Sequence, residues 1–396
     1  MRISPKTTPL RTIVAALTFA LPLAAAADPA PSASPPDEAI DDRAPLAPAE
    51  GTPGSELTAR GRDVRGVYIP YPKVRKAKPE ALAKWVLGLG ANAAVVDVKD
   101  DRGRVTFTRD LPYARGPMHG EVKQMAAIVR AFHDAGIYVI GRLVSFKDQA
   151  LALSQPKVAL RHRKTGAIWR DHGNLAWVDP HSELARAHIV SVARAAEALG
   201  FDEIQLDYIR FPVEPAARDA VFPCRDGTPA RWDVIALTLA AVDRAIRIPL
   251  SIDVFGLTAY HPGDADGLGQ SLEHLAPYVD AVTPMVYLAN WPRRYWENPD
   301  PDTTHGLVEG AVREIRRRLG DGIAVRPLLQ AFKWRAKLFS GAFIADQIRA
   351  SQGGGASGYL FWNQSGSYGI VQTTWRRMDA VAAAAEKDEL DLLARR

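Results

Sequence analysis

The amino-acid sequence predicts a (β/α)8 TIM barrel over residues 63–386, and three observations lead to it. From Val64 onward, short apolar runs typical of strands alternate with longer amphipathic runs typical of helices. Eight such pairs occupy roughly three hundred residues, within the usual size of this fold. Glycine occurs where a helix must end before the next strand, at positions 90, 136, 200, 320 and 358.

The order of the elements follows from the same periodicity. Strands are predicted at residues 64–69, 92–99, 138–146, 203–211, 249–255, 279–287, 324–332 and 359–363. Helices are predicted at residues 79–89, 122–135, 182–199, 231–246, 268–275, 307–319, 343–350 and 375–385. A doubly wound sheet is the weaker alternative, because the glycine-rich stretches 88–90 and 353–355 both precede a strand and so lack the context of a phosphate-binding loop.

The N-terminal residues 1–27 have the pattern of a signal peptide. Basic residues precede an apolar run from Ile13 to Leu23, and four alanines then lead to Asp28. The apolar run is shorter than the ~20 residues that a membrane span needs, so an uncleaved anchor is the less favoured alternative. We therefore expect an exported protein, periplasmic or secreted, without stable membrane insertion after the leader is cleaved.

The segments that flank the barrel differ from it in composition. Residues 28–62 are rich in Pro, Ala, Ser and acidic residues, which predicts a disordered spacer. Residues 387–396 are expected to form a C-terminal tail. The chain has one cysteine, Cys224, so no intramolecular disulfide can form and the core must stabilise the fold.

Charge gives no support for nucleic-acid binding. The formal charge is +5, but it falls to +2 without Arg2, Lys6 and Arg11 of the predicted leader. No stripe of basic residues interleaved with aromatic residues is found elsewhere in the sequence. We expect a polysaccharide, and no nucleic acid, as the partner.

Carboxylates recur near the ends of three predicted strands. Because side chains alternate between the two faces of a strand, Asp97, Asp207 and Asp253 are all expected to point into the barrel, opposite aliphatic neighbours. A single aspartate there could merely cap a loop or pair with an arginine. Three of them at the carboxyl ends of strands predict a functional cluster, because active sites of this fold lie at that face.

Other polar and aromatic side chains near strand ends are expected to line the same site. They are Lys99, Arg142, Tyr208, Arg210, Tyr287, Gln330, Trp362 and Asn363. The alternative for the two basic residues Lys99 and Arg142 is that they only neutralise a carboxylate, and the alternative for the aromatic residues is core packing.

The residue types favour glycoside hydrolysis, in which one carboxylate attacks or stabilises the sugar centre while another protonates the leaving oxygen. None of the nine histidines forms a His-x-His pair or lies in a strand-end carboxylate motif, so no metal site and no cofactor are expected. No Gly-x-Ser-x-Gly motif supports a serine nucleophile.

Four segments resemble the glycoside hydrolase family known as domain of unknown function 4015. They are Val95–Gly103, Trp177–Pro180, Leu206–Pro212 and Pro284–Tyr287. The third contains Asp-Tyr-Ile-Arg-Phe-Pro and is more distantly similar to the glycoside-hydrolase-10-like proteins of bacteria. The resemblance covers residues 64–385 and implies a TIM barrel that acts on extracellular or cell-wall polysaccharide.

The resemblance also implies roles for the aspartates. In related α-galactosidase-like barrels the nucleophile ends strand four, the position of Asp207 here. Families differ over whether the acid follows strand five or strand six, and strand six here ends without a carboxylate. Asp253 is therefore expected as the general acid, with Asp97 as the runner-up. A glycan-binding barrel without catalysis, in which Arg or Lys locks every aspartate, and a metal-dependent polysaccharide deacetylase remain as alternatives.

Overall fold

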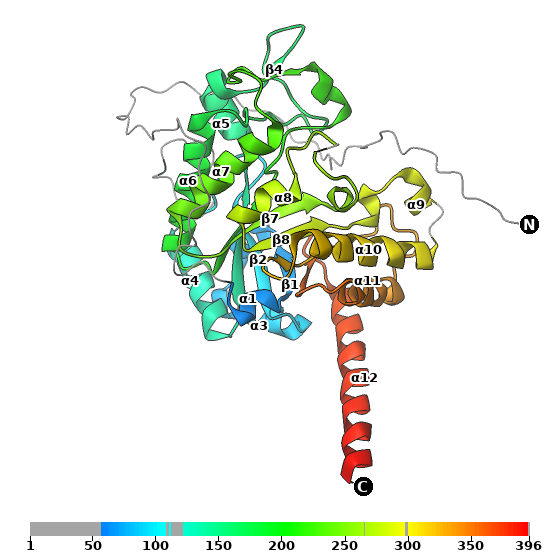
Figure 1. The fold of residues 1–396 in the computed structure, drawn as a ribbon. Helices are drawn as coiled ribbons and strands as arrows, with labels where there is room; N and C mark the ends of the chain where they lie inside the picture. The colour runs from blue at the N-terminus through cyan, green and yellow to red at the C-terminus, as the bar shows by residue number, and fades with distance from the viewer. Residues whose placement is uncertain (1–56, 108–110, 112–121, 265, 298–299, 395–396) are drawn as a thin grey trace, which may run out of the picture.

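The computed structural model describes residues 57–394 except 108–110, 112–121, 265 and 298–299 (Figure 1). Its centre is a closed parallel barrel in the order β1-β2-β3-β5-β7-β8-β9/β10-β11-β1, with β8 paired to both β9 and β10. The strands are β1 (Arg65–Ile69), β2 (Ala93–Lys99), β3 (Tyr138–Val144), β5 (Glu203–Asp207), β7 (Leu250–Phe255), β8 (Ala281–Met285), β9 (Ala324–Val325), β10 (Leu328–Gln330) and β11 (Tyr359–Trp362). The predicted (β/α)8 barrel is confirmed.

Helices surround this barrel in the predicted order. The main ones are α3 (Pro79–Leu89), α4 (Val122–Asp134), α6 (Glu183–Ala198), α7 (Arg231–Ala245), α8 (Leu272–Leu275), α10 (Pro301–Leu319), α11 (Gly341–Gly353) and α12 (Gly369–Ala394). Shorter turns are α2 (Tyr71–Lys76), α5 (Gln149–Ser154), α9 (Arg293–Glu297) and the 3-10 turns η1 (Pro156–Val158), η2 (Pro215–Asp219), η3 (Gly256–Ala259), η4 (Ala276–Tyr278) and η5 (Leu288–Asn290). The main hydrophobic core lies between strands and helices, and a smaller apolar cluster that includes Val95, Ile140 and Leu360 lies inside the barrel.

Several strands are shorter than predicted, and two of them differ from the prediction for local backbone reasons. The fourth barrel strand, β5, ends at Asp207 instead of residue 211, because Tyr208 has a φ of +50° and leaves the extended conformation. The seventh strand is split into β9 and β10 around Pro327, which has no N–H to donate to a neighbouring strand. Asp207 therefore occupies the rim of the barrel.

Part of the predicted spacer is ordered. Residues 57–62 lie in or beside helix α1 (Ala59–Arg62), whose first turn is capped by the Thr58 side chain. Leu57 packs against Ala281 and Ala324, and the Gly61 carbonyl accepts a hydrogen bond from buried Arg326. The predicted boundary at residue 62 is corrected to residue 57 for this reason. The predicted leader and residues 28–56 of the spacer lie outside the described residues.

The predicted C-terminal tail is helical as far as the structure describes it. Helix α12 begins earlier than predicted and continues to Ala394. Val371 and Trp375 are buried against the barrel, whereas residues 379–388 are exposed and the helix extends away from the body (Figure 1). Alanine-rich sequence has a high helix propensity without tertiary contacts, which explains the extension.

Two long connections meet at the end of the barrel opposite α1. The segment after β3 contains β4 (Arg161–His162), and the segment after β5 contains β6 (Ala220–Val221). The two strands pair antiparallel and lie at the top of Figure 1. No helix among the described residues is long and apolar enough to span a membrane.

Candidate active site

The structure brings Asp97, Asp207 and Asp253 together inside the barrel, on β2, β5 and β7. All three are buried. Leu206 pairs in register with Ile252, so the next residues along the two strands, Asp207 and Asp253, are neighbours on strands about 4.8 Å apart. The backbone register therefore brings these aspartates together at the carboxyl ends of the strands.

Arg142 on β3 joins two of the three carboxylates. It donates from Nη1 to Asp97 Oδ1 at 2.6 Å, and from Nε and Nη2 to Asp207 Oδ2 at 2.9 and 2.5 Å. Burial alone would lower the pKa of Arg142, but the carboxylates of Asp207 and Asp97 raise it well above its usual value. A permanent cation therefore lies between them.

Asp97 has both oxygens occupied. The Tyr68 hydroxyl donates to its Oδ2 at 2.6 Å, and Arg142 donates to its Oδ1. Burial raises the pKa of Asp97, and Arg142 and Tyr68 oppose this effect. With both oxygens engaged by protein donors, Asp97 is placed to orient Arg142 rather than to protonate a ligand.

Asp253 has the opposite surroundings. Neither of its oxygens has a hydrogen-bond partner among the described residues. Burial raises the pKa of Asp253 well above its ordinary value, and nearby Asp207 raises it further against the opposing charges of Arg142 and Arg326. Next to it on β8, Thr283 accepts from Gln205, whose own Oε1 is also unpartnered. A proton on Asp253 would supply a donor where the barrel has surplus acceptors.

Aromatic rings cover this group of charges. Tyr68 and Trp362 stack with ring centroids 3.9 Å apart, and the Arg142 guanidinium lies 4.9 Å from the Trp362 ring. Trp362 is half-buried. Tyr287 is buried, and burial raises its pKa, with smaller contributions from the charges of Asp253 and Asp207. Trp362 contacts Tyr68 and Arg142, and the role of Trp362 and Tyr287 in binding sugar stays a prediction.

Comparison with known proteins identifies the family. The family model described as "Putative glycosyl hydrolase domain", domain of unknown function 4015, matches residues 66–368. The chain belongs to this family. No curated protein sequence matches the chain significantly. The more distant resemblance to glycoside-hydrolase-10-like proteins stays a prediction.

Two solved glycoside hydrolase structures share the fold of this glycosyl hydrolase family member, and a third structure is similar in sequence over part of the chain. The PgaB (BpsB) glycoside hydrolase domain of Bordetella bronchiseptica is 16% identical, with a TM-score of 0.56 over 76% of this chain and 93% of the other. The α-L-fucosidase isoenzyme 2 of Paenibacillus thiaminolyticus is 13% identical, with a TM-score of 0.53 over 81% and 50%. A hypothetical protein of Ruminiclostridium thermocellum is 34% identical over 48% of this chain and 97% of its own, with a TM-score of 0.42. Family membership identifies the barrel as a glycosyl hydrolase domain, which implies a glycan as substrate.

Lys99 of this glycosyl hydrolase domain lies away from the aspartates, contrary to the prediction. It is fully buried and pairs with Asp148 at 2.5 Å. The pairing of β2 with β3 shifts register between Asp97 and Lys99, so alternation along the strand is broken there. The Asp148 carboxylate also caps α5, which makes this ion pair part of the loop framework.

Two other predicted residues use their polar groups on nearby loops. Gln330 donates to the carbonyls of Phe332 and Trp334 and accepts from the Ala289 N–H. Asn363 donates to the carbonyls of Ala331 and Ser367. Neither amide has a group directed at the aspartates, and we correct their predicted role from sugar contact to loop support.

The two residues after Asp207 that were predicted to bind substrate have different positions. The Tyr208 N–H donates to Asp207 Oδ1 at 2.6 Å, so the turn that ends β5 also holds this carboxylate. Arg210 pairs with Glu214 at 2.9 Å and stacks over the Trp177 ring at 5.0 Å. Arg210 therefore stabilises the loop and does not contact the aspartate, because Glu214 provides its charge partner.

Tyr68 and Lys147, which were not among the predicted residues, also lie at or beside the site. Tyr68 points into the barrel from β1, and the alternation in Val64–Ile69 could have indicated this. Lys147 lies beyond the end of β3, 4.9 Å from the Tyr208 ring, and pairs with Asp171 at 3.0 Å. Since Lys147 and Asp171 lie outside the strands, periodicity carried no signal for either of them.

Proposed function

We propose that this chain is an exported glycoside hydrolase that cleaves a polysaccharide, either a cell-wall glycan or an exopolysaccharide, with Asp207 and Asp253 as the reacting carboxyl groups. One observation carries the proposal: two neighbouring carboxyl groups have opposite environments. Asp207 is paired with the Arg142 guanidinium, whereas Asp253 is buried without a partner and has a raised pKa. In such a pair one carboxyl group can act as the charged nucleophile and the other as the protonated general acid.

In the proposed reaction the Asp207 carboxylate attacks the anomeric carbon of the bound sugar. The glycosidic bond breaks as Asp253 gives its proton to the leaving oxygen, and water attacks the glycosyl ester with Asp253 now acting as base. Carboxyl groups about 5–5.5 Å apart favour this retaining course, and groups about 6.5–9.5 Å apart favour inversion. The adjacent positions of Asp207 and Asp253 on β5 and β7 support retention.

The surrounding residues would orient the Asp207 carboxylate and the sugar without taking part in bond making or breaking. Arg142 fixes the Asp207 carboxylate through two donors, and Asp97 with Tyr68 holds Arg142 in place. The half-buried Trp362, stacked on Tyr68, offers an aromatic face on which a pyranose can lie. Export rests on the leader-like residues 1–27.

Glycan cleavage tests the proposal. The protein should release reducing ends from cell-wall or exopolysaccharide preparations, and the Asp207→Asn variant should release none while it remains folded at the assay temperature. The first sugar formed should keep the anomeric configuration of the substrate when followed by NMR. Turnover by Asp207→Asn equal to that of the unsubstituted protein would remove Asp207 from the reaction.

A glycan-binding barrel without catalysis is the second candidate, because Arg142 locks both Asp97 and Asp207. It requires that Asp253 be locked as well, and no hydrogen-bond donor among the described residues reaches it. A metal-dependent deacetylase would need three or more clustered ligands, and the described part of the chain contains no such group of His, Cys, Asp and Glu. Release of acetate that a chelator abolishes would favour the deacetylase over the hydrolase.

A further inference from the structure

A strongly basic segment lies beside the candidate active site. Residues 156–170, here called the basic hairpin, contain five Lys or Arg residues and no Asp or Glu. The five are Lys157, Arg161, Arg163, Lys164 and Arg170. The hairpin includes β4 and turns at Gly166, which has a φ of +69°. Lys157, Arg163 and Lys164 are exposed.

None of these five cations forms an ion pair with a carboxylate among the described residues. Arg161 donates to the carbonyls of Pro156 and Gly166, and Arg170 donates to Gln149 and the Asn174 carbonyl. Asp219 lies nearby, since its carbonyl accepts from the Arg163 N–H, but its carboxylate faces Arg218 at 4.0 Å. The positive charge of the hairpin is therefore uncompensated within the described chain.

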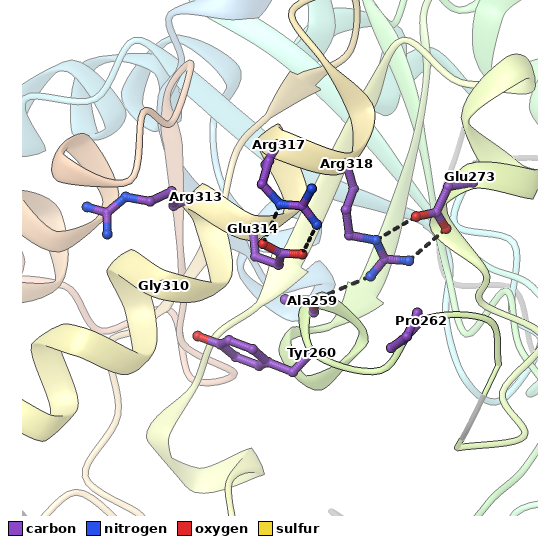
Figure 2. Close-up of a pocket in the computed structure, with 9 residues that line it drawn as sticks. All are labelled: Ala259, Tyr260, Pro262, Glu273, Gly310, Arg313, Glu314, Arg317 and Arg318. Atoms are coloured by element: carbon purple, nitrogen blue, oxygen red, sulfur yellow. Dashed lines mark hydrogen bonds and ion pairs between the residues drawn. The ribbon is translucent and has the colours of Figure 1, made fainter.

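A second group of surface arginines, unlike those of the hairpin, is paired with carboxylates. A groove of about 440 Å³ between α10 and η3 is lined by three of them (Figure 2). Arg317 pairs with Glu314 and Arg318 with Glu273, as Figure 2 shows, and Arg313 pairs with Glu309. Because each guanidinium already has a carboxylate, this groove has no free charge for a ligand, unlike the hairpin.

The basic hairpin is tied to the site through Trp177. The Leu160 N–H donates to the Trp177 carbonyl, and the Trp177 ring meets the Tyr208 ring edge-on at 5.6 Å between centroids. Tyr208 directly follows Asp207. In Figure 1 the hairpin around β4 stands at the end of the barrel opposite α1 and α12, which is the end where the aspartates lie. A polymer crossing the aspartates would extend beside the hairpin.

We propose that the basic hairpin binds the acidic groups of a polyanionic glycan, carboxylates or phosphates, in the part of the polymer that flanks the cleaved bond. The inference rests on the proposed function and deepens it by naming the substrate class. Unpaired Lys and Arg side chains attract a charged polymer and hold it through charge-assisted hydrogen bonds. A neutral glycan would gain nothing from five uncompensated cations.

Binding to polymers of matched backbone and different charge tests this. Full-length Asp207→Asn protein would be titrated with carboxymethyl dextran, phosphorylated dextran and plain dextran at rising NaCl concentrations. We expect affinity for one or both acidic polymers, with loss of affinity as salt screens the charges, and none for dextran. The acidic polymer that binds more tightly shows whether the hairpin recognises carboxylates or phosphates. Equal affinity for dextran, or for duplex DNA, would overturn the inference.

Neutralising the hairpin supplies the second test. The Arg163→Gln/Lys164→Gln variant should bind the acidic polymer about fivefold more weakly for each charge removed, on the scale of one cation near an anionic surface. The matched control is Arg376→Gln/Arg377→Gln, which removes two exposed charges from α12 at the other end of the barrel. Equal losses in both variants, or no loss in the hairpin variant, would contradict the proposal.

Failure of the proposed function is distinguishable from failure of this inference. Salt-sensitive binding that depends on the hairpin, with no cleavage of any glycan by the unsubstituted protein, would reject the hydrolase and keep the binding surface. If the protein cleaves a neutral glycan, and neutralising the hairpin does not change the rate, the hydrolase function stands and the polyanionic substrate is rejected.

Discussion

Asp253 is the residue whose chemistry departs most from that of an ordinary aspartate. Burial without a hydrogen-bond partner disfavours its charged form, so its pKa is raised far above the ordinary 3.8. A carboxyl group whose pKa is higher in the folded than in the unfolded protein makes its full contribution to stability at pH values below its ordinary pKa. This contribution is lost as the pH rises through the raised value, because folding must then either bury a charge or bind a proton.

The Asp253→Asn variant should therefore gain stability over the unsubstituted protein as pH rises. The amide cannot ionise, so its melting temperature lacks the decline that Asp253 causes at higher pH. Thermal unfolding at a series of pH values from about 4, near the ordinary carboxyl pKa, upward measures the difference. Asp226→Asn, at an exposed position, serves as the control and should show no such trend. A pH-independent difference for Asp253→Asn would contradict a protonated Asp253.

Strand periodicity could predict the three aspartates but not their separate surroundings. Alternation alone placed Asp97, Asp207 and Asp253 on one face, because the regular strands kept the expected parity. It failed for Lys99, where the register of β2 shifts after Asp97. The partnership of Arg142 with two carboxylates depends on contacts between strands, which no single stretch of sequence contains.

At the scale of elements, the barrel has a second polar layer below the site. Arg326, on the loop between β9 and β10, donates to both oxygens of Glu203 on β5, and both side chains are fully buried. Ser251 and Tyr138 also donate to Glu203, at 2.5 and 3.1 Å. The layer links β3, β5, β7 and helix α1 away from the aspartates.

Removing one member of this pair should cost more than removing both. The Arg326→Met variant leaves the Glu203 charge buried without its main partner, and should lose about 3–5 kcal/mol of unfolding free energy. The double variant Glu203→Leu/Arg326→Met removes both charges and should recover much of that loss. Urea unfolding at neutral pH measures both. A double variant as unstable as Arg326→Met would show that packing, not charge pairing, governs this layer.

Element types were easier to predict than element ends. Helices and strands followed from apolar periodicity because each packs one face against the same core. Their ends depend on single residues and distant contacts. Tyr208 ends β5 through its positive φ, and α1 is held by Arg326, which lies more than two hundred residues away along the chain.

At the scale of the whole molecule, two features combine into one account. The barrel brings an arginine-paired carboxylate and a partnerless one together at the end that carries the basic hairpin. Overall charge did not predict this arrangement, because a formal charge of +5 over the whole chain does not show where the charges gather. The fold class was predictable since it depends on the order of elements, whereas the surface charge pattern depends on which side chains remain unpaired after folding.

The central claim is that Asp207 attacks and Asp253 protonates, and the leaving group of the substrate tests it most directly. The rates of cleavage of a polysaccharide and of an activated aryl glycoside of the same sugar are compared for two variants. Asp253→Asn should lose about 10²–10⁴-fold on the polysaccharide, whose leaving oxygen needs a proton, and far less in the glycosylation step with the activated glycoside. The Asp207→Asn variant should cleave neither the polysaccharide nor the activated glycoside. Equal losses on both substrates for Asp253→Asn, or cleavage by Asp207→Asn, would contradict the account.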